Sequence, residues 1–441
     1  MYHVAIPRSS LAIFLLIAVL TTSGRAQDTA NGDLTALADQ CDAHLRKSIV
    51  DFYLPHCVDE KNGGYLETID AEGKFCESEY KFLTLQTRQM WFFCQLVKND
   101  IEKEKALAAA KSGFDFLQTH FLDKENGGYF SRVTMDGGEF DTRKHIYLNA
   151  FAMYGLAAYY NATGDGEALA AALNLFEKFE QKAYDKQNGG YREFFYADWT
   201  EITDPNEPKF VGEVGTKTYN SHLHILEAFT ELFRAAPSDR LKERIAELIV
   251  INTSTVRHPQ HPCNIDRWTN DWQMVKEDFN LRASYGHDVE CAWLVFDAAR
   301  EIGWSIKPLQ NWAVATVDHS IKFGFDAEHG GFYYSGPLGE ASDDTKKEWW
   351  TQAEALVSML EMYRLTGDEK YMDVFHKTFA FVEQYQIASA ENGGGWWASR
   401  HADGSTHANT SRTSTWHGAY HNGRAMILCG ELLREMAVKQ E

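Results

Sequence analysis

Two kinds of apolar segment alternate along this chain of 441 residues. Residues 104–121 (EKALAAAKSGFDFLQTHF) carry charges on one helical face, whereas residues 145–160 (HIYLNAFAMYGLAAYY) are apolar almost all round. A one-sided helix covers a core from outside, and a helix that is apolar on every side is buried within it. The pattern therefore predicts an outer and an inner layer of helices.

A turn with a glycine pair separates each outer segment from the next inner segment. It is written KNGGY at 61–65, ENGGY at 125–129, QNGGY at 187–191, HGGF at 329–332 and NGGGW at 392–396. The successive pairs lie 64, 62, 141 and 64 residues apart, so the long interval holds about two periods. A sixth unit without glycines is expected near residues 261–272. Tandem Gly and Asn permit the positive φ angles of a tight reversal, so we interpret this marker turn as structural and not as a ligand loop.

Six units of two helices each predict an all-α fold, an (α/α)6 barrel with short β-hairpins at one end. A helical repeat buries its apolar face only by stacking on its neighbours, and ring closure removes both open ends. An open superhelical array is the alternative. No Pro/Ser-rich linker or block of charge divides the chain, so residues 27–441 are expected to form a single domain.

Residues 1–26 have the composition of a secretory signal peptide. Arg8 precedes an apolar run at about 11–20, and Gly24-Arg25-Ala26 offers a small-residue cleavage site. The alternative, a membrane anchor, needs about 20 apolar residues, and this run is shorter. We therefore expect a secreted or periplasmic protein that leaves the membrane after cleavage.

The charge and the cysteine content of the chain limit the classes of partner and ligand that it can bind. Without residues 1–26 the chain has 41 basic and 63 acidic residues, a formal charge of −22. Nucleic acid and anionic membranes are poor partners for such a surface, while a neutral sugar is compatible with it. The seven cysteines are scattered, so at most a pair such as Cys57 and Cys76 could form a disulfide, and no Cys/His spacing predicts a metal. A monomer or homodimer is expected.

In a closed ring all inner helices start at the same end, so residues early in each should converge on one cavity. These positions hold Arg88, Tyr147, His224, His287, Trp350 and His421. Aromatic faces stack on sugar rings, and His and Arg supply proton transfer and charge stabilisation. The set is typical of a carbohydrate site.

The spacing of these residues along each helix indicates which of their side chains share a face. Asn220 and His224 are four apart and share a face, which we expect to line the cavity, whereas His222 faces elsewhere and is more typical of a structural residue. His287 and Glu290 are three apart, so the carboxylate is positioned to orient the imidazole as a general base, or to form a structural pair.

The other candidates have competing explanations. Arg88 lies among apolar residues, where it either stabilises an anion or forms a structural ion pair. His258 and His261 belong to the connection of the sixth unit and are interpreted as loop residues. His417 lies further out in the turn that precedes the last inner helix, so it is a weaker candidate than His421 for the cavity.

Two histidines on different helices favour proton transfer on two sides of a substrate over glycoside hydrolysis. Hydrolysis usually needs paired carboxylates at a set separation. The nearest candidates, Asp288 and Glu290, lie two apart on one helix and point in different directions.

Five stretches carry a resemblance to a known family. They are residues 81–93 (KFLTLQTRQMWFF), 217–234 (KTYNSHLHILEAFTELFR), 284–294 (SYGHDVECAWL), 347–359 (KEWWTQAEALVSM) and 416–425 (WHGAYHNGRA). With them the chain resembles the N-acylglucosamine 2-epimerase family, most closely its cellobiose-type branch. The resemblance implies an (α/α)6 barrel without metal or cofactor. It also implies epimerisation at carbon 2 of a reducing sugar, a cellobiose-like disaccharide or glucose and mannose, through a cis-enediolate.

The resemblance also implies roles, carried over by matching position. His287 and His421 look like the acid/base pair, with Glu290 supporting His287, and Arg88 looks like the group that stabilises charge on oxygen 1. The residues that look like sugar ligands or stacking platforms are Tyr147, Asn220, His224, Trp350 and Trp416. Alternatives that remain are an aldose–ketose isomerase, an N-acylglucosamine 2-epimerase, a secreted (α/α)6 glycoside hydrolase or lyase, and a non-catalytic carbohydrate-binding toroid.

Overall fold

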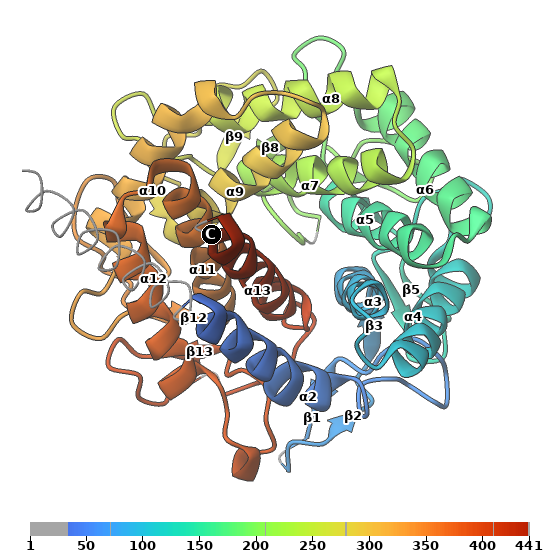
Figure 1. Ribbon diagram of the computed structural model, residues 1–441. Helices are drawn as coiled ribbons and strands as arrows, with labels where there is room; N and C mark the ends of the chain where they lie inside the picture. The colour runs from blue at the N-terminus through green and yellow to red at the C-terminus, as the bar shows by residue number, and fades with distance from the viewer. Residues whose placement is uncertain (1–33, 71, 208, 278–279, 409, 440–441) are drawn as a thin grey trace, which may run out of the picture.

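The helices form two concentric layers (Figure 1). The computed structural model describes residues 34–439, apart from 71, 208, 278–279 and 409. The inner helices are α3 (Leu83–Lys98), α5 (Ile146–Thr163), α7 (Tyr219–Ala235), α9 (Tyr285–Glu301), α11 (Trp349–Thr366) and α13 (Tyr420–Lys439). The outer helices are the segment 34–53, which ends in η1 (Leu45–Val50) and α2 (Asp51–Tyr53), then α4 (Lys103–Phe116), α6 (Gly166–Lys178), α8 (Asp239–Val250), α10 (Gln310–Gly324) and α12 (Glu369–Phe381).

Ring closure is visible in the contacts between inner helices. Each inner helix packs against the next one along the chain, and α13 packs against α3 and against η1 at the start of the chain. The first and last units therefore meet, which confirms the (α/α)6 barrel and excludes the open superhelical array. The π-helical segments η2 (Leu117–Phe121), η3 (Phe179–Ala183), η4 (Ile251–Thr255) and η6 (Val382–Gln386) extend four outer helices, and η5 (Lys307–Leu309) and η7 (Ala390–Asn392) are single 3₁₀ turns.

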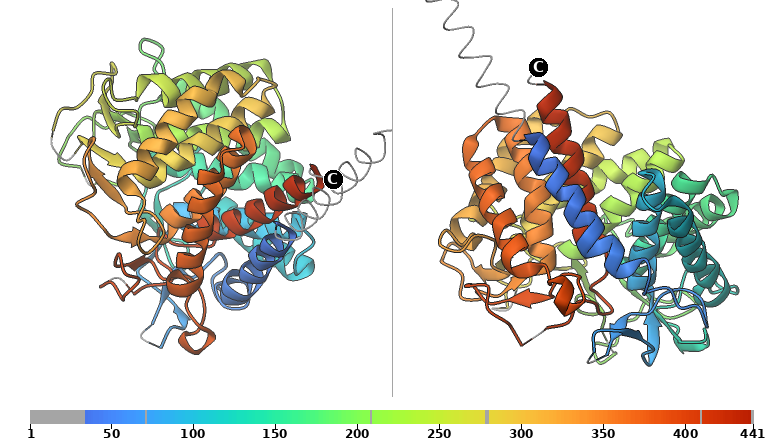
Figure 2. Two further views of the ribbon diagram at one scale, coloured as in Figure 1. Left: turned by 60° about the vertical axis from the view of Figure 1, so that its left-hand side comes forward. Right: turned by 60° about the horizontal axis from the view of Figure 1, so that its bottom comes forward.

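Short antiparallel strands gather at one end of the barrel (Figure 2). Four two-stranded pairs join a strand that leads into an inner helix to a strand of the next unit: β6 (Lys144–His145) with β7 (Phe194–Phe195), β8 (Thr216–Thr218) with β9 (Arg267–Thr269), β10 (Arg282–Ser284) with β11 (Ser335–Pro337), and β12 (Lys347–Glu348) with β13 (Ser399–Arg400). The remaining sheets are β1 (Thr68–Ile69) with β2 (Phe75–Cys76), and β3 (Tyr80–Phe82) with β4 (Arg132–Thr134) and β5 (Glu139–Asp141). The strands tie neighbouring units together at the end where the inner helices begin.

Four of the five glycine-pair turns are closed by an aspartate and a buried lysine, and in the fifth Arg412 donates to the carbonyls of Asn392 and Gly394. In the first turn Asp59 Oδ1 accepts the backbone N–H groups of residues 61 and 62, and Lys81 Nζ lies 2.8 Å from Asp59 Oδ2. Gly63 and Gly64 have φ angles of +83° and +66°, which confirms the structural reading of the turn. Three further pairs repeat the arrangement: Asp123–Lys144, Asp185–Lys217 and Asp326–Lys347.

The sixth unit forms the same turn with different residues. Arg257 and Asn264 make its isolated bridge, and His258 Nδ1 accepts the backbone N–H groups of Gln260 and His261 in place of the aspartate. No residue from 257 to 264 has a positive φ, so this turn does not require glycine. This turn begins at residue 257, a few residues before the predicted segment 261–272. His258 and His261 are loop residues, as expected.

Two predictions concern residues outside the core helices. All seven cysteines are free, so Cys57 and Cys76 do not form a disulfide. The predicted signal peptide, residues 1–26, lies outside the described residues, and export stays a prediction. Within the part of the chain that the structure describes, no helix combines the length and apolarity needed to cross a bilayer.

A buried carboxyl at the start of α3 predicts a pH-dependent stability difference. Glu67 accepts hydrogen bonds from Phe82 N at 2.6 Å and Gln86 Nε2 at 2.9 Å, and burial raises its pKa from 4.5 to about 8. The folded state therefore binds a proton that the unfolded state releases above pH 4.5. The wild type should lose about 1.4 kcal/mol per pH unit relative to Glu67→Gln as pH rises through this window, and the difference should level off near pH 8.

Urea unfolding of both proteins from pH 5 to 9 measures this difference. Glu104→Gln, on the exposed side of α4, controls for the loss of a surface carboxylate. A stability difference between wild type and Glu67→Gln that stays constant over this range would contradict the buried protonated carboxyl.

Candidate functional site

A cavity of about 600 Å³ opens at the strand end of the barrel, above the first turns of the inner helices. Eight of the nine predicted residues line it: Arg88, Tyr147, Asn220, His224, His287, Trp350, Trp416 and His421. Tyr147, Asn220, Trp350 and His421 hold the second position of their helices, and Arg88 and His224 hold the sixth. Positions four apart share a helical face, so each inner helix directs the same face to the axis. The predicted convergence is confirmed, and Glu290 lies beneath the cavity.

His421 is held by a carboxylate from a neighbouring helix. Its Nδ1 lies 2.6 Å from Glu354 Oε1, while Trp293 Nε1 donates to Glu354 Oε2 at 3.0 Å. This contact fixes the ring and leaves Nε2 for the cavity. Burial, followed by the nearby Arg88 and Arg424 charges, holds the pKa of His421 well below its usual value. The imidazole is therefore neutral at neutral pH and able to accept a proton.

His287 is held by a hydroxyl and not by the predicted carboxylate. Its Nδ1 lies 2.8 Å from Ser284 Oγ, and its ring centroid lies 4.7 Å from that of Trp350. Burial, together with His224 and Arg88, lowers the pKa of His287 to about 3. Glu290 makes no hydrogen bond to His287 among the described residues, so the predicted orienting pair is wrong. The Glu290 carboxylate instead accepts from Arg424 Nη2 at 2.8 Å, a charge-assisted bond that is stronger than one to a neutral imidazole.

A second carboxylate–imidazole pair was not predicted. His224 Nδ1 lies 2.8 Å from Glu227 Oε2 on the same helix. The two residues are three apart, the same spacing that drew attention to His287 and Glu290, so the sequence contained the signal. Burial lowers the pKa of His224, which leaves a neutral ring at the cavity wall.

One arginine joins three buried carboxylates below the cavity. Arg424 Nη1 contacts Glu227 Oε1, and its Nη2 lies 2.8 Å from both Glu290 Oε1 and Glu354 Oε1. Although burial opposes it, Arg424 lowers the pKa of Glu227 to about 2, whereas burial and the neighbouring Glu354 raise the pKa of Glu290 well above 4.5. A single cation cannot balance three anions in a dry site, so burial favours the protonated form of Glu290. A further cavity of about 410 Å³ lies on the other side of this cluster.

Arg88 has no carboxylate partner in the described part of the chain, so the structural ion pair does not form. Its Nη2 donates to Tyr147 Oη at 2.7 Å and its Nη1 to the Trp416 carbonyl at 3.3 Å, while Nε has no partner. The guanidinium lies 4.1 Å from the ring centroid of Phe151. A buried cation compensated only by neutral groups and ring faces can bind an anionic oxygen at the cavity.

The remaining cavity residues offer hydrogen bonds and ring faces. Asn220 Oδ1 has no partner among the described residues. Trp350 lies between the two candidate acid/base histidines, with its ring centroid 5.8 Å from that of His421, and its Nε1 donates to Glu348 Oε2. The ring of Trp416 packs edge-on against Phe82 at 4.9 Å.

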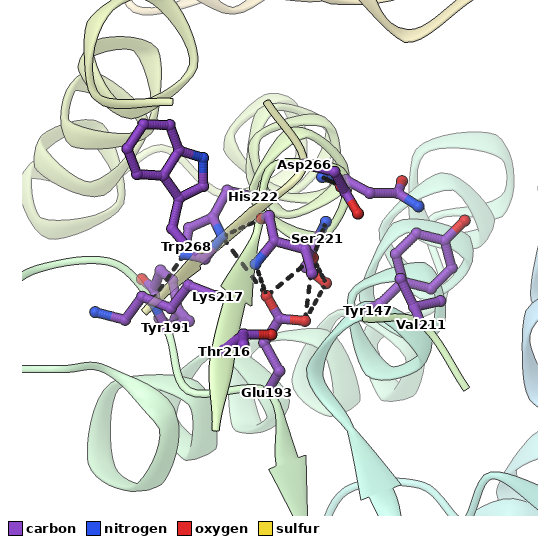
Figure 3. Close-up of polar contacts among 12 residues, drawn as sticks. Tyr147, Tyr191, Glu193, Val211, Thr216, Lys217, Ser221, His222, Asp266 and Trp268 are labelled. Carbon is purple, nitrogen blue, oxygen red and sulfur yellow. Dashed lines mark hydrogen bonds and ion pairs between the residues drawn. The ribbon is translucent and has the colours of Figure 1, made fainter. Parts of the chain in front are cut away.

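In five inner helices the fourth residue bonds to the backbone next to the marker turn. This contact explains the placement of His222 and of Asp288. Gln86, Asn149 and Gln352 accept the backbone N–H that follows each glycine pair. His222 does the same for Tyr191 N at 3.0 Å, and Figure 3 shows it on the Tyr191 side of α7, away from Tyr147 and Asp266. His222 is therefore structural, as expected.

Asp288 holds this same position on α9. Its Oδ1 accepts Asn264 N at 3.1 Å, so the carboxylate faces the turn and not the cavity. This placement removes it from any carboxylate pair for hydrolysis. His417 is likewise outside the cavity, stacked on Trp349 at 4.0 Å.

Two groups of side chains below the cavity satisfy the distances of metal ligands. His224, His287 and Glu290 form one group, and Glu290, Glu354 and His421 form the other. Both glutamates already bind Arg424, which competes with a cation for their oxygens. The sequence prediction of a metal-free site stays a prediction.

Comparison with known proteins gives consistent matches over most of the chain. A family model described as N-acylglucosamine 2-epimerase (GlcNAc 2-epimerase) matches residues 64–424. Cellobiose 2-epimerase of Bacteroides fragilis is 31% identical over 408 residues, covering 90% of this chain and 99% of that protein. Cellobiose 2-epimerase of Dictyoglomus turgidum is 30% identical and covers 92% and 100%. The solved structure of cellobiose 2-epimerase from Bacillus thermoamylovorans superimposes with a TM-score of 0.82 at 29% identity, covering 90% of this chain and 99% of that one.

Proposed function

The chain belongs to the N-acylglucosamine 2-epimerase family, and on that basis we propose that it interconverts the carbon-2 epimers of a reducing sugar. The substrates are cellobiose and related β-1,4-linked disaccharides, or glucose and mannose. The observation that carries the proposal is the cavity wall itself: two neutral imidazoles from different helices, each held through Nδ1, beside an arginine without a carboxylate partner. The reaction needs no cofactor.

The two histidines transfer protons, Arg88 stabilises charge, and the other cavity residues bind the sugar. The sugar ring opens, and one of His287 and His421 removes the weakly acidic proton at carbon 2. Negative charge develops on oxygen 1 of the cis-enediolate, where Arg88 stabilises it. Rotation about the bond between carbons 2 and 3 presents the other face, and the second histidine returns a proton there. Asn220, His224 and Tyr147 bind sugar oxygens, and Trp350 and Trp416 stack on the sugar.

The second imidazole must carry a proton before it can return one. Both rings are neutral at neutral pH, and burial together with Glu354 favours the protonated form of the adjacent Glu290 carboxyl. An oxygen of Glu290 lies within 4.8 Å of nitrogens of His224 and His287. Glu290 therefore supports the reaction as a proton store, in place of the orienting role that its spacing suggested.

Among the residues that the structure describes, the cavity holds no free carboxylate pair of the kind that the hydrolase alternative needs. Asp266 accepts Asn220 N at 3.2 Å, and Glu348 is paired with Lys346 at 2.9 Å and with the indole of Trp350. Both carboxylates that line the cavity are thus engaged by the protein. The isomerase alternative shares the enediolate and differs only in where the proton returns.

Incubation in deuterated water separates these reactions. Purified protein is given cellobiose, lactose, mannose, glucose and N-acetylglucosamine, and the anomeric protons are followed by NMR. We expect a new aldose epimer that carries deuterium at carbon 2. An unchanged aldose with fresh ketose would establish an isomerase instead, a shortened oligosaccharide would establish a hydrolase, and binding without turnover would leave only a carbohydrate-binding toroid.

A further inference from the structure

Three potential metal ligands meet at the unit without glycines, which is the fourth along the chain, and they lie outside the cavity. Cys263 lies in the turn that lacks glycines, Asp288 in the first turn of α9, and His319 on the outer helix α10. The Cys263 sulfur, a carboxylate oxygen of Asp288 and a ring nitrogen of His319 all lie within 4.8 Å of one another. All three residues are buried, with His319 only 5% exposed.

The polar atoms of this trio are not satisfied by the protein. Asp288 Oδ2 and both ring nitrogens of His319 have no hydrogen-bond partner among the described residues. The three groups face one another without bonding to one another. Buried polar atoms without partners are costly, and such atoms in a native structure call for an explanation such as a bound ion.

The other units have different residues at the positions equivalent to Cys263, Asp288 and His319. At the position of Cys263 they have the last glycine of the marker turn, and at the position of Asp288 four of them have Gln86, Asn149, His222 or Gln352. His319 lies six residues before the bridging Phe325, and Phe116 and Phe381 lie six before the bridging residues Leu122 and Ile387. Those phenylalanines pack on Gly64 and Gly331. The first and fifth units along the chain have glycine, amide and phenylalanine at these positions, whereas the unit without glycines has thiol, carboxylate and imidazole.

We propose that Cys263, Asp288 and His319 bind a divalent transition-metal ion, Zn²⁺ in the first instance. Thiolate, imidazole and carboxylate are all zinc ligands, and a thiolate with a carboxylate balances its two positive charges. The fourth position is left to water or to His261, whose ring centroid lies 6.4 Å from that of His319. The site joins the 258–263 turn to the start of α9, one residue from His287.

Protonation of the metal-free trio is consistent with this assignment. Burial raises the pKa values of Cys263 and of Asp288, the latter to about 8, and lowers that of His319 to about 4. Without a cation all three groups are therefore neutral at pH 7. A metal ion would take the place of the thiol and carboxyl protons. The adjacent cation, Arg257, donates to Thr316 Oγ1 at 2.9 Å and leaves Asp288 Oδ2 open.

The test uses the purified mature protein, stripped with a chelator and then supplied with Zn²⁺ or Co²⁺ alone. We expect one ion per chain by elemental analysis, a rise in Tm of roughly 2–5 °C with Zn²⁺, and with Co²⁺ a thiolate charge-transfer band and intense visible bands of a tetrahedral site. Cys263→Gly and His319→Phe introduce the residues of the other units, so both should fold and lose all three signals. Cys94→Ala, at a buried cysteine on α3, should keep them.

Several outcomes would overturn the proposal. The absence of a thiolate–cobalt band in the wild type does so even if the variants fail to fold. Binding that survives in Cys263→Gly and His319→Phe but is lost in His224→Phe would place the ion at the cavity instead. These readouts require no sugar turnover, so the result is independent of the proposed epimerase activity.

Discussion

Replacing His421 with alanine is expected to lower kcat for epimerisation by about 10²–10⁴-fold, and His287→Ala should have a loss of the same order. Each imidazole is fixed through Nδ1, His421 by Glu354 and His287 by Ser284. The measurement is the rate of appearance of the product epimer by NMR, with circular dichroism to confirm that each variant is folded.

Hydrogen exchange at carbon 2 distinguishes a two-base mechanism from a merely structural role. Each variant keeps one base and should still exchange the carbon-2 proton of one epimer with solvent deuterium, while losing exchange with the other epimer. The two variants should show opposite preferences. Equal loss of exchange with both epimers in both variants, or a kcat within a few fold of the wild type, would contradict the assignment.

A smaller loss of kcat is expected when Glu354, which holds the His421 ring, is replaced. Glu354→Gln keeps a hydrogen-bond acceptor beside Nδ1 but removes its negative charge, so kcat should fall less than in His421→Ala. That ordering separates positioning of the ring from proton transfer by the ring.

The ring of helices was predictable because one local signal recurs at a fixed period. The glycine pairs locate each unit, and the alternation of one-sided and all-round apolar helices assigns the layers. Once the ring closes, second and sixth positions of inner helices must face the axis. Six of the nine candidate residues hold these positions and line the cavity, whereas His287 lies third on its helix and Trp416 precedes the start of α13.

Partners from distant helices could not be predicted by the same argument. Glu290 lies three residues from His287, yet it bonds to Arg424, which is 134 residues away in sequence. His421 likewise depends on Glu354, 67 residues away. Spacing along one helix shows which contacts are possible, whereas the choice among them depends on which charges other helices bring to the axis. The buried Lys81–Asp59 pair was also missed, although its residues lie only 22 apart and the same pair recurs in three further turns.

Replacing Arg424 with methionine is expected to destabilise the protein by about 3–5 kcal/mol. Arg424 is the cation that contacts Glu227, Glu290 and Glu354 in the barrel core, and removing one partner of a buried ion cluster leaves the other charges uncompensated. Methionine occupies a similar volume, so the loss reports mainly on charge. Urea unfolding at pH 7, followed by circular dichroism, measures it.

The pH dependence of this loss has a defined sign. In the wild type Arg424 holds the pKa of Glu227 at about 2, below its unfolded value of 4.5, so the stabilisation is fully present above pH 4.5 and is lost progressively as pH falls from 4.5 to about 2. Without Arg424 the buried carboxylates instead favour protonation. The stability gap between wild type and Arg424→Met should therefore be widest near pH 7 and narrow as the pH falls toward 4.5.

Single carboxylate variants locate the charges within the cluster. Glu290→Gln should change stability at pH 7 by less than about 1 kcal/mol because burial raises the pKa of Glu290 and favours its protonated form, whereas Glu227→Gln removes an ionised partner of Arg424 and should cost more. Combining Glu227→Gln with Arg424→Met should recover part of the loss, since one uncompensated charge is then absent. A stability gap for Arg424→Met that widens on acidification, or a larger cost for Glu290→Gln than for Glu227→Gln, would show that the proton resides elsewhere in the cluster.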